Sequence, residues 1–121
     1  MNIEAFRQNC LNRPGVEETL PFGPDTLVYK VLGKAFALTG LDEDEFRVNL
    51  KCHPERALQL RDEYPDQILP GWHMNKKHWN TVYFEAGLPE ALVEDLIDHS
   101  YQLVVEGLPR KMRDTLAEWN G

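Results

Sequence analysis

The sequence predicts an α+β protein: an antiparallel sheet of about four or more strands with helices packed on one face. Residues 46–51 alternate apolar and polar side chains, which is typical of a strand with one wet face. Residues 89–106 instead repeat apolar side chains every three or four positions, which indicates a helix. Because the chain has 121 residues, we expect one domain spanning residues 1–121.

The first half of the chain predicts a helix followed by three strands. Asn2 can cap a helix to about Asn12, since apolar residues recur at i, i+3, i+7 and i+8 from Ile3. The breakers in residues 21–25 predict a loop. Residues 26–31 and 35–39 are rich in β-formers and flank a tight connection, so with residues 46–51 they predict a three-stranded meander.

The second half predicts three helices and one more strand. Pro54 suits the first turn of a helix that runs to about Tyr64. Residues 79–84 alternate again and predict a fourth strand. Gly107 suits the end of the long helix, and Pro109 opens a last one.

The net charge and the lack of a targeting signal limit the classes of partner and the cellular location that we expect. The net charge of −7 argues against a nonspecific binder of nucleic acid or anionic membranes. The first ten residues lack the features of a secretory signal, and no stretch approaches the roughly 20 apolar residues that span a bilayer. We therefore expect a cytoplasmic location without membrane association, with Cys10 and Cys52 as buried thiols rather than a disulfide.

The sequence offers no recognisable catalytic or metal motif. Asp98, His99 and Ser100 are the residue types of a triad, but neighbouring helical side chains diverge by about 100°. We expect Ser100 to bond to its own helix. His73 and His78 are five positions apart, off the spacing of a helical metal pair. We expect no catalytic residue, metal or cofactor.

The most function-like stretch is residues 67–84, which hold no acidic side chain. Basic residues such as Lys76 and Lys77 lie there between aromatic ones such as Trp72 and Trp79. This combination can hold phosphates while stacking a planar group. The alternatives are that the aromatic residues belong to the core and that the lysines are a solvated turn.

Several strings in the sequence resemble the MmcQ/YjbR-like family of small bacterial proteins. They are FGPD at 22–25, VYKV at 28–31, KAFAL at 34–38, VNLKC at 48–52 and LIDHSY at 96–101. The most specific is PGWHMNKKHWNTV at 70–82. The resemblance covers nearly the whole chain.

The resemblance implies a fold similar to the CyaY (frataxin-like) arrangement. The family is often described as a DNA-binding "double wing" domain, generally without an assigned enzyme activity, so the resemblance implies a DNA-binding, regulatory module. Iron is not expected, because the first helix offers only Glu4 instead of an acidic ridge.

Two binding hypotheses therefore stand beside each other for a monomeric protein, and enzymatic activity with His73 or His78 as the acid–base group is a third alternative. One is binding of DNA, and the other is binding of a small molecule or protein partner by residues 72–79. The residues expected to contact DNA or another ligand are Lys30, Lys34, Lys51, His73, Asn75, Lys76, Lys77, His78 and Trp79.

Overall fold

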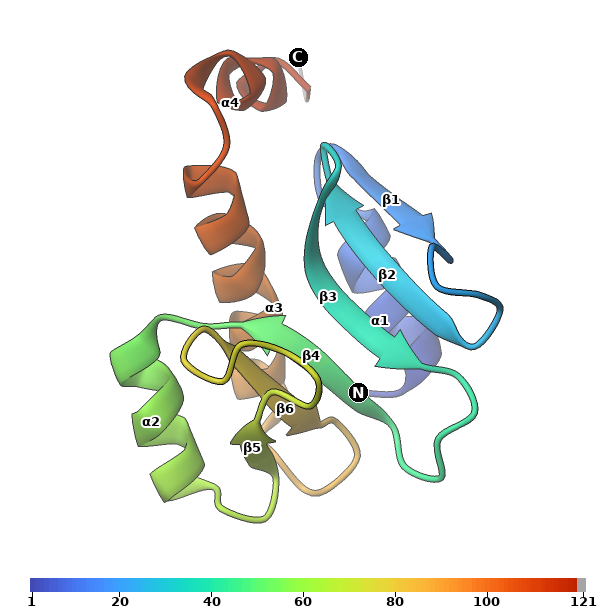
Figure 1. The fold of residues 1–121 in the computed structure, drawn as a ribbon, viewed down its shortest axis with the longest axis vertical. Helices are drawn as coiled ribbons and strands as arrows, with labels where there is room; N and C mark the ends of the chain where they lie inside the picture. The colour runs from blue at the N-terminus through green and yellow to red at the C-terminus, as the bar shows by residue number, and fades with distance from the viewer. Residues whose placement is uncertain (120–121) are drawn as a thin grey trace.

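The computed structural model describes residues 1–119, which form one antiparallel sheet and four helices (Figure 1). The sheet order is β1-β2-β3-β4-β6-β5. The strands are β1 (Val16–Thr19), β2 (Thr26–Val31), β3 (Lys34–Gly40), β4 (Arg47–Lys51), β5 (Ile68–Pro70) and β6 (Trp79–Tyr83). The helices are α1 (Ile3–Leu11), α2 (Pro54–Glu63), α3 (Glu90–Glu106) and α4 (Arg110–Ala117).

This architecture confirms the predicted α+β class. Every expected helix and strand forms, with bounds that differ by one or two residues. The Asn2 side chain caps α1 by accepting a hydrogen bond from the Ala5 amide over 2.9 Å, as its residue type favours. Gly107 ends α3, and its amide donates to the last carbonyls of that helix.

The two edge strands, β1 and β5, were not predicted. β1 has four residues, two of them glutamates, and β5 has three residues and ends at Pro70. Segments this short carry too few positions to show a periodicity of two, and a proline inside a run argues against a strand. Pairing with β2 and β6 holds them in place.

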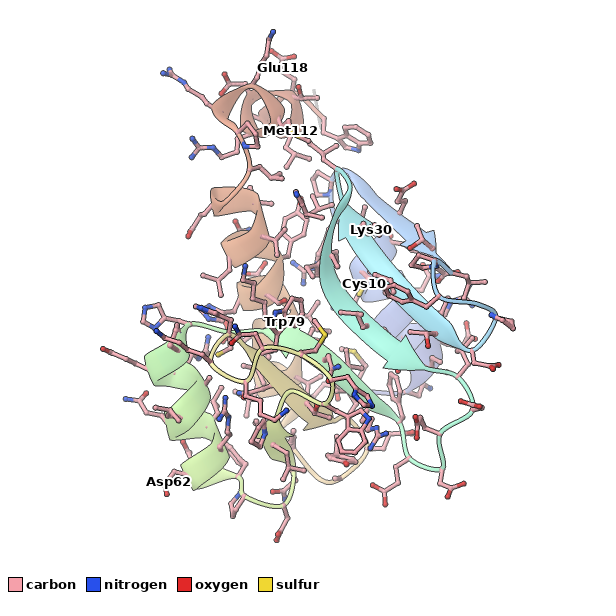
Figure 2. All side chains as sticks on the ribbon, viewed as in Figure 1. Cys10, Lys30, Asp62, Trp79, Met112 and Glu118 are labelled. Carbon is pink, nitrogen blue, oxygen red and sulfur yellow. The ribbon has the colours of Figure 1, made fainter. Side chains whose placement is uncertain are left out.

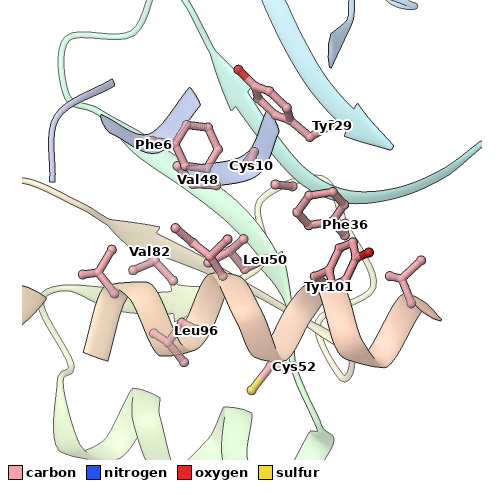
Figure 3. Packing of buried hydrophobic residues seen from close by; sticks show 14 of the residues in the cluster. Phe6, Cys10, Tyr29, Phe36, Val48, Leu50, Cys52, Val82, Leu96 and Tyr101 are labelled. Atoms are coloured by element: carbon pink, nitrogen blue, oxygen red, sulfur yellow. The ribbon is translucent and has the colours of Figure 1, made fainter. Parts of the chain in front are cut away.

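The core lies between the sheet and the helices. Side chains from α1, α2, α3 and the strands form one buried cluster, part of which Figure 3 shows. The Phe6 ring meets the rings of Tyr29 and Phe84 edge-on at 5.2 and 5.4 Å. Each such aromatic pair contributes about 0.5–1.5 kcal/mol beyond area burial. In Figure 1, α1 and α3 lie behind the sheet, so its opposite face is turned toward the viewer.

A polar cluster fixes α1 to the edge of the sheet. The Glu18 carboxylate on β1 accepts from both Nε and a terminal nitrogen of Arg7, at 2.9 and 3.1 Å, and from the Tyr29 hydroxyl at 2.6 Å. The Arg7 hydrogen bond is the main cause that lowers the pKa of Glu18. Hydrogen bonds that involve an ionised group, as these do, are stronger than hydrogen bonds between neutral groups.

The structure corrects the expectation for Ser100. Its hydroxyl donates to the Phe36 carbonyl on β3 at 2.5 Å and accepts from the Lys51 amide on β4 at 2.8 Å. The serine therefore joins the middle of α3 to two strands, and it does not bond to its own helix. Its small side chain lets the helix approach the sheet closely enough for this.

The two cysteines are free and buried, as predicted. Burial raises the pKa of the Cys10 thiol to about 12 and that of Cys52 to about 11. Both are therefore thiols rather than reactive thiolates at neutral pH.

Candidate functional site: a cleft on the open face of the sheet

The face of the sheet without helices carries a row of side chains from four neighbouring strands. Val28 pairs with Leu38, Leu38 with Asn49, and Asn49 with Thr81. Because side chains at paired positions share a face, these four residues point away from the helices. The middle of this open face is apolar over β2 and β3 and polar over β4 and β6.

A cleft of about 580 Å³ opens above this row. Val28 and Leu38 lie in its floor, Phe22 from the β1–β2 loop is on its rim, and Trp72 and Met74 come from the segment between β5 and β6. Phe22 is 75 % exposed and Trp72 is 56 % exposed. Large apolar side chains that border a cleft and stay this exposed are typical of binding surfaces, whereas those of a hydrophobic core are buried.

Three charged side chains line the cleft: Lys30, Arg47 and Glu43. The lining therefore carries a net charge of +1, from two cations and one carboxylate, in a chain of net charge −7. Arg47 is already partnered, since one of its terminal nitrogens lies 3.1 Å from a Glu43 oxygen and its guanidinium lies 5.6 Å above the Trp72 ring. A hydrogen bond with Tyr83, more than the charge of Glu43, raises the pKa of Arg47.

Trp72, His73 and Met74 form one wall of the cleft, called here the Trp72 wall. Two side chains of the sheet attach this wall to the cleft floor. The Asn49 amide group donates to the Trp72 carbonyl at 3.0 Å, and the Thr81 hydroxyl accepts from the Trp72 amide at 2.9 Å. The same hydroxyl donates to the Asn49 oxygen at 2.6 Å. Each polar group of this triangle has a partner within the protein, so the triangle serves to position the wall.

The start of the wall also requires a glycine. Gly71 is buried, and its amide donates to the Trp79 carbonyl at 2.9 Å. A Cβ at this position would lie 2.8 Å from the Trp79 Cβ and 2.9 Å from its main-chain oxygen. The wall lies this close to β6 because residue 71 has no side chain.

The far side of the segment is held by α2. Arg61 donates from Nε to the Asn80 side chain at 2.7 Å and from a terminal nitrogen to the Lys76 carbonyl. The Asn75 side chain accepts from the Lys77 amide at 2.9 Å, a local turn. The segment is thus held from both ends by defined hydrogen bonds.

His73 has an unusual backbone. Its φ is +59°, in the left-handed region that non-glycine residues rarely adopt. Its ring lies beside that of Trp72, with 4.8 Å between centroids, and it lines the cleft. The backbone turn at residue 73 therefore places two consecutive rings at the cleft.

The structure brings only two of the nine expected binding residues to the cleft, Lys30 and His73. Asn75 and Lys76 support the segment through hydrogen bonds, and the His78 carbonyl accepts from the Cys52 amide at 2.8 Å. The other four, Lys34, Lys51, Lys77 and Trp79, do not line it. Figure 2 labels Lys30 on β2 and Trp79 at the start of β6, with β3 and β4 between those strands.

The cleft also contains residues that were not among the expected ones. They are chiefly Phe22, Val28, Leu38 and Glu43. The strand alternation of residues 46–51 places Arg47, which also lines the cleft, on the wet face with Asn49. Nothing in the sequence indicates that the β1–β2 loop reaches the same place.

The Asp98–Ser100 string does not form a catalytic relay. The Asp98 carboxylate pairs with Arg13 at 2.7 Å, whereas the His99 Nε2 accepts from the His53 amide at 3.1 Å. Burial, followed by the charge of Arg56, lowers the pKa of His99.

Within residues 1–119, no group of three or more histidine, cysteine or acidic side chains is placed to hold a metal ion. No helix of that part of the chain has the length and apolar character to cross a bilayer.

The fold and the cleft define an α+β protein with an open-faced antiparallel sheet. Comparison with known sequences gives its family: the YjbR family model matches residues 11–103, and the chain belongs to this family. The chain is 43% identical to YbdF of Escherichia coli O157:H7 over 108 residues, covering 89% of this chain and 88% of YbdF. It is 36% identical to YjbR of E. coli K12 over 118 residues, covering 98% and 99%.

Solved structures show the same fold. A Deinococcus radiodurans protein, DR2400, has a TM-score of 0.88 at 40% identity, covering 96% of this chain and 88% of its own. A Pseudomonas syringae protein has a TM-score of 0.69 at 28% identity, covering 85% and 98%. The expected membership of the MmcQ/YjbR-like family is confirmed.

Proposed function

We propose that the protein binds a small molecule in the open-face cleft. The observation that carries the proposal is the cleft itself: about 580 Å³, with an apolar floor of Val28 and Leu38. Ligand sites are mostly apolar concavities of about 300–1,000 Å³ with a few convergent polar groups. Lys30, Arg47 and His73 are such groups here.

The held position of the Trp72 wall supports this proposal. A wall fixed by Asn49, Thr81 and Arg61 loses little conformational freedom when a ligand binds, and such preorganisation improves affinity. The proposed role is binding within a single-domain, monomeric protein of the bacterial cytoplasm.

A screen of small molecules by two-dimensional NMR tests the proposal. A true ligand should shift the amides of Val28, Leu38 and Trp72 together. Leu38→Trp should fill the cleft and abolish these shifts, whereas Leu58→Trp on the exposed side of α2 should leave them unchanged. A ligand whose shifts persist in Leu38→Trp, with the fold intact, would contradict the cleft as the site.

DNA binding is the second candidate, and the lysines favour it. Within residues 1–119, none of the lysines expected to bind has a carboxylate within 4 Å: Lys30, Lys34, Lys51, Lys76 and Lys77. Ammonium groups without a carboxylate partner are available to phosphates, although that of Lys76 also donates to the Gly71 carbonyl at 3.3 Å. The net charge of −7 opposes this role at long range.

Fluorescence anisotropy with duplex and single-stranded DNA at two salt concentrations separates the candidates. DNA binding should weaken by nearly one logarithmic unit per decade of salt for each phosphate contact. The double variant Lys76→Gln/Lys77→Gln should reduce that slope, whereas Lys111→Gln on α4 should not. No binding even at about 50 mM salt would reject DNA as the partner.

A further inference from the structure

We propose that the ligand of the cleft is a small aromatic anion: one planar ring system carrying a carboxylate, sulfonate or phosphate. The inference rests on the proposed small-molecule function and specifies its chemistry. The ring would lie on the apolar floor between Phe22 and Trp72, and the anionic group would meet Lys30.

The sign of the ligand follows from the charges that line the cleft. Arg47 and Glu43 neutralise each other at 3.1 Å. Lys30 has no carboxylate within 4 Å among residues 1–119, although Glu17 is its cross-strand partner. An anion is therefore the ligand charge that this lining leaves unmatched, in a protein whose overall charge is negative.

The planar shape follows from the walls and floor. Phe22 and Trp72 are both largely exposed on the rim, and the Arg47 guanidinium covers the Trp72 ring at 5.6 Å. Aromatic side chains favour stacked or edge-on contact with other rings. Val28 and Leu38 offer no hydrogen-bonding side chain, so the middle of the ligand must be apolar.

The sheet fixes which end of the cleft takes the anion. Lys30 pairs with Ala35 at one end, whereas Arg47 begins β4 at the other, beyond the row of Val28, Leu38 and Asn49. From Thr26 to Lys30, β2 covers roughly 13 Å. A ligand of two or three fused or linked rings is of comparable length to this stretch of β2.

Two fluorescent probes with nearly the same rings isolate the charge. The sulfonate 8-anilinonaphthalene-1-sulfonate carries the anion, and N-phenyl-1-naphthylamine lacks it. We expect the sulfonate to bind the folded protein about tenfold more tightly than the neutral probe, because a charge pair between the sulfonate and Lys30 should favour it by roughly that factor. Both affinities are measured by fluorescence titration, with far-ultraviolet circular dichroism to confirm that each variant is folded.

Variants assign the charge to its residue. Lys30→Met should reduce the affinity for the sulfonate about tenfold and leave that for the neutral probe unchanged. Lys51→Met, which removes a lysine outside the cleft, should change neither. Leu38→Trp should reduce the affinity for both probes, which would show that both occupy the cleft.

The outcomes separate this inference from the function on which it rests. Equal binding of both probes, sensitive to Leu38→Trp but not to Lys30→Met, would overturn the anionic ligand and leave the small-molecule cleft standing. Binding that Leu38→Trp leaves unchanged, or no binding of either probe, would overturn the proposal that the ligand is an aromatic anion. Only the absence of any NMR-detected ligand in the cleft would then contradict the proposed function itself.

Discussion

The side-chain amide of Asn49 donates a hydrogen bond to the main-chain carbonyl of Trp72, over 3.0 Å and across 23 positions of the sequence. This contact joins the centre of β4 to the segment that forms one wall of the cleft. Since Thr81 completes the connection from β6, the wall position depends on two polar side chains of the open face. The shape of the cleft is therefore decided by the sheet as much as by the wall itself.

Asn49→Ala should loosen this wall. The substitution removes the donor to the Trp72 carbonyl and the acceptor of the Thr81 hydroxyl, at an expected cost of about 0.5–1.5 kcal/mol in the free energy of unfolding. The amide of Trp72 should also exchange its hydrogen faster, as NMR can measure. Lys77→Ala, a change at an exposed side chain, serves as the control, and equal exchange in both variants would contradict the role of Asn49.

Gly71→Ala should destabilise the fold more than its size suggests. The added methyl group would lie 2.8–2.9 Å from Trp79 atoms, including a main-chain oxygen that cannot rotate away. Overpacking of this kind costs about 1–3 kcal/mol, measurable by urea denaturation. Gly107→Ala is the matched control, because its Cβ would find only ordinary contacts from 3.5 Å outward. Similar losses in both variants would show that the close approach at Gly71 is not the cause.

Ser100→Ala should weaken the attachment of α3 to the sheet. The Lys51 amide and the Phe36 carbonyl would lose their shared partner, and an unsatisfied buried group costs about 1–3 kcal/mol. Thermal unfolding of Ser100→Ala beside Thr115→Ala measures this. The Thr115 hydroxyl bonds within its own exposed helix turn, so its loss should matter little. A Ser100→Ala protein as stable as the control would contradict the bridging role.

The pH dependence of stability should contain a contribution from Glu18. Hydrogen bonding from Arg7 lowers the pKa of this carboxyl in the folded state. The resulting stabilisation is complete above the unfolded pKa of about 4.3, and it is lost as the pH falls from there through the folded pKa.

Glu18→Gln should therefore be less stable than the natural chain at pH 7, by about 1–2 kcal/mol. The difference should shrink as the pH falls toward 3. Urea denaturation at four pH values measures it, with Glu17→Gln on the opposite face of β1 as the control. A difference that stays constant from pH 7 to pH 3 would show that the charge of Glu18 is not its source.

The parts of the fold that the sequence predicted are those with enough residues to show a pattern. The alternation in residues 46–51 and the apolar stripe of α3 span several repeats, and both elements form as expected. β5, with three residues, depends on pairing with β6, a contact that no local pattern contains. The order in which β6 lies between β4 and β5 likewise arises from tertiary packing.

The site was predicted less completely, for a physical reason. The string around His73 is distinctive in its side chains, yet Lys76 and His78 contribute main-chain carbonyls to the structure. Residue types cannot indicate such use of the backbone. Lys30 and His73 do line the cleft, but Arg47 and Phe22 join them only because the sheet order brings four segments together.

The shortness of the two outer strands bears on how the protein meets other copies of itself during refolding. An exposed strand edge is a template on which a second chain can add, and long flat edges seed fibres. Here one border has four residues, with two glutamates, and the other has three and ends at Pro70, which has no amide hydrogen to donate. Both edges of the sheet are therefore poor templates for a further strand. Refolding of the protein at high concentration should yield few strand-swapped aggregates.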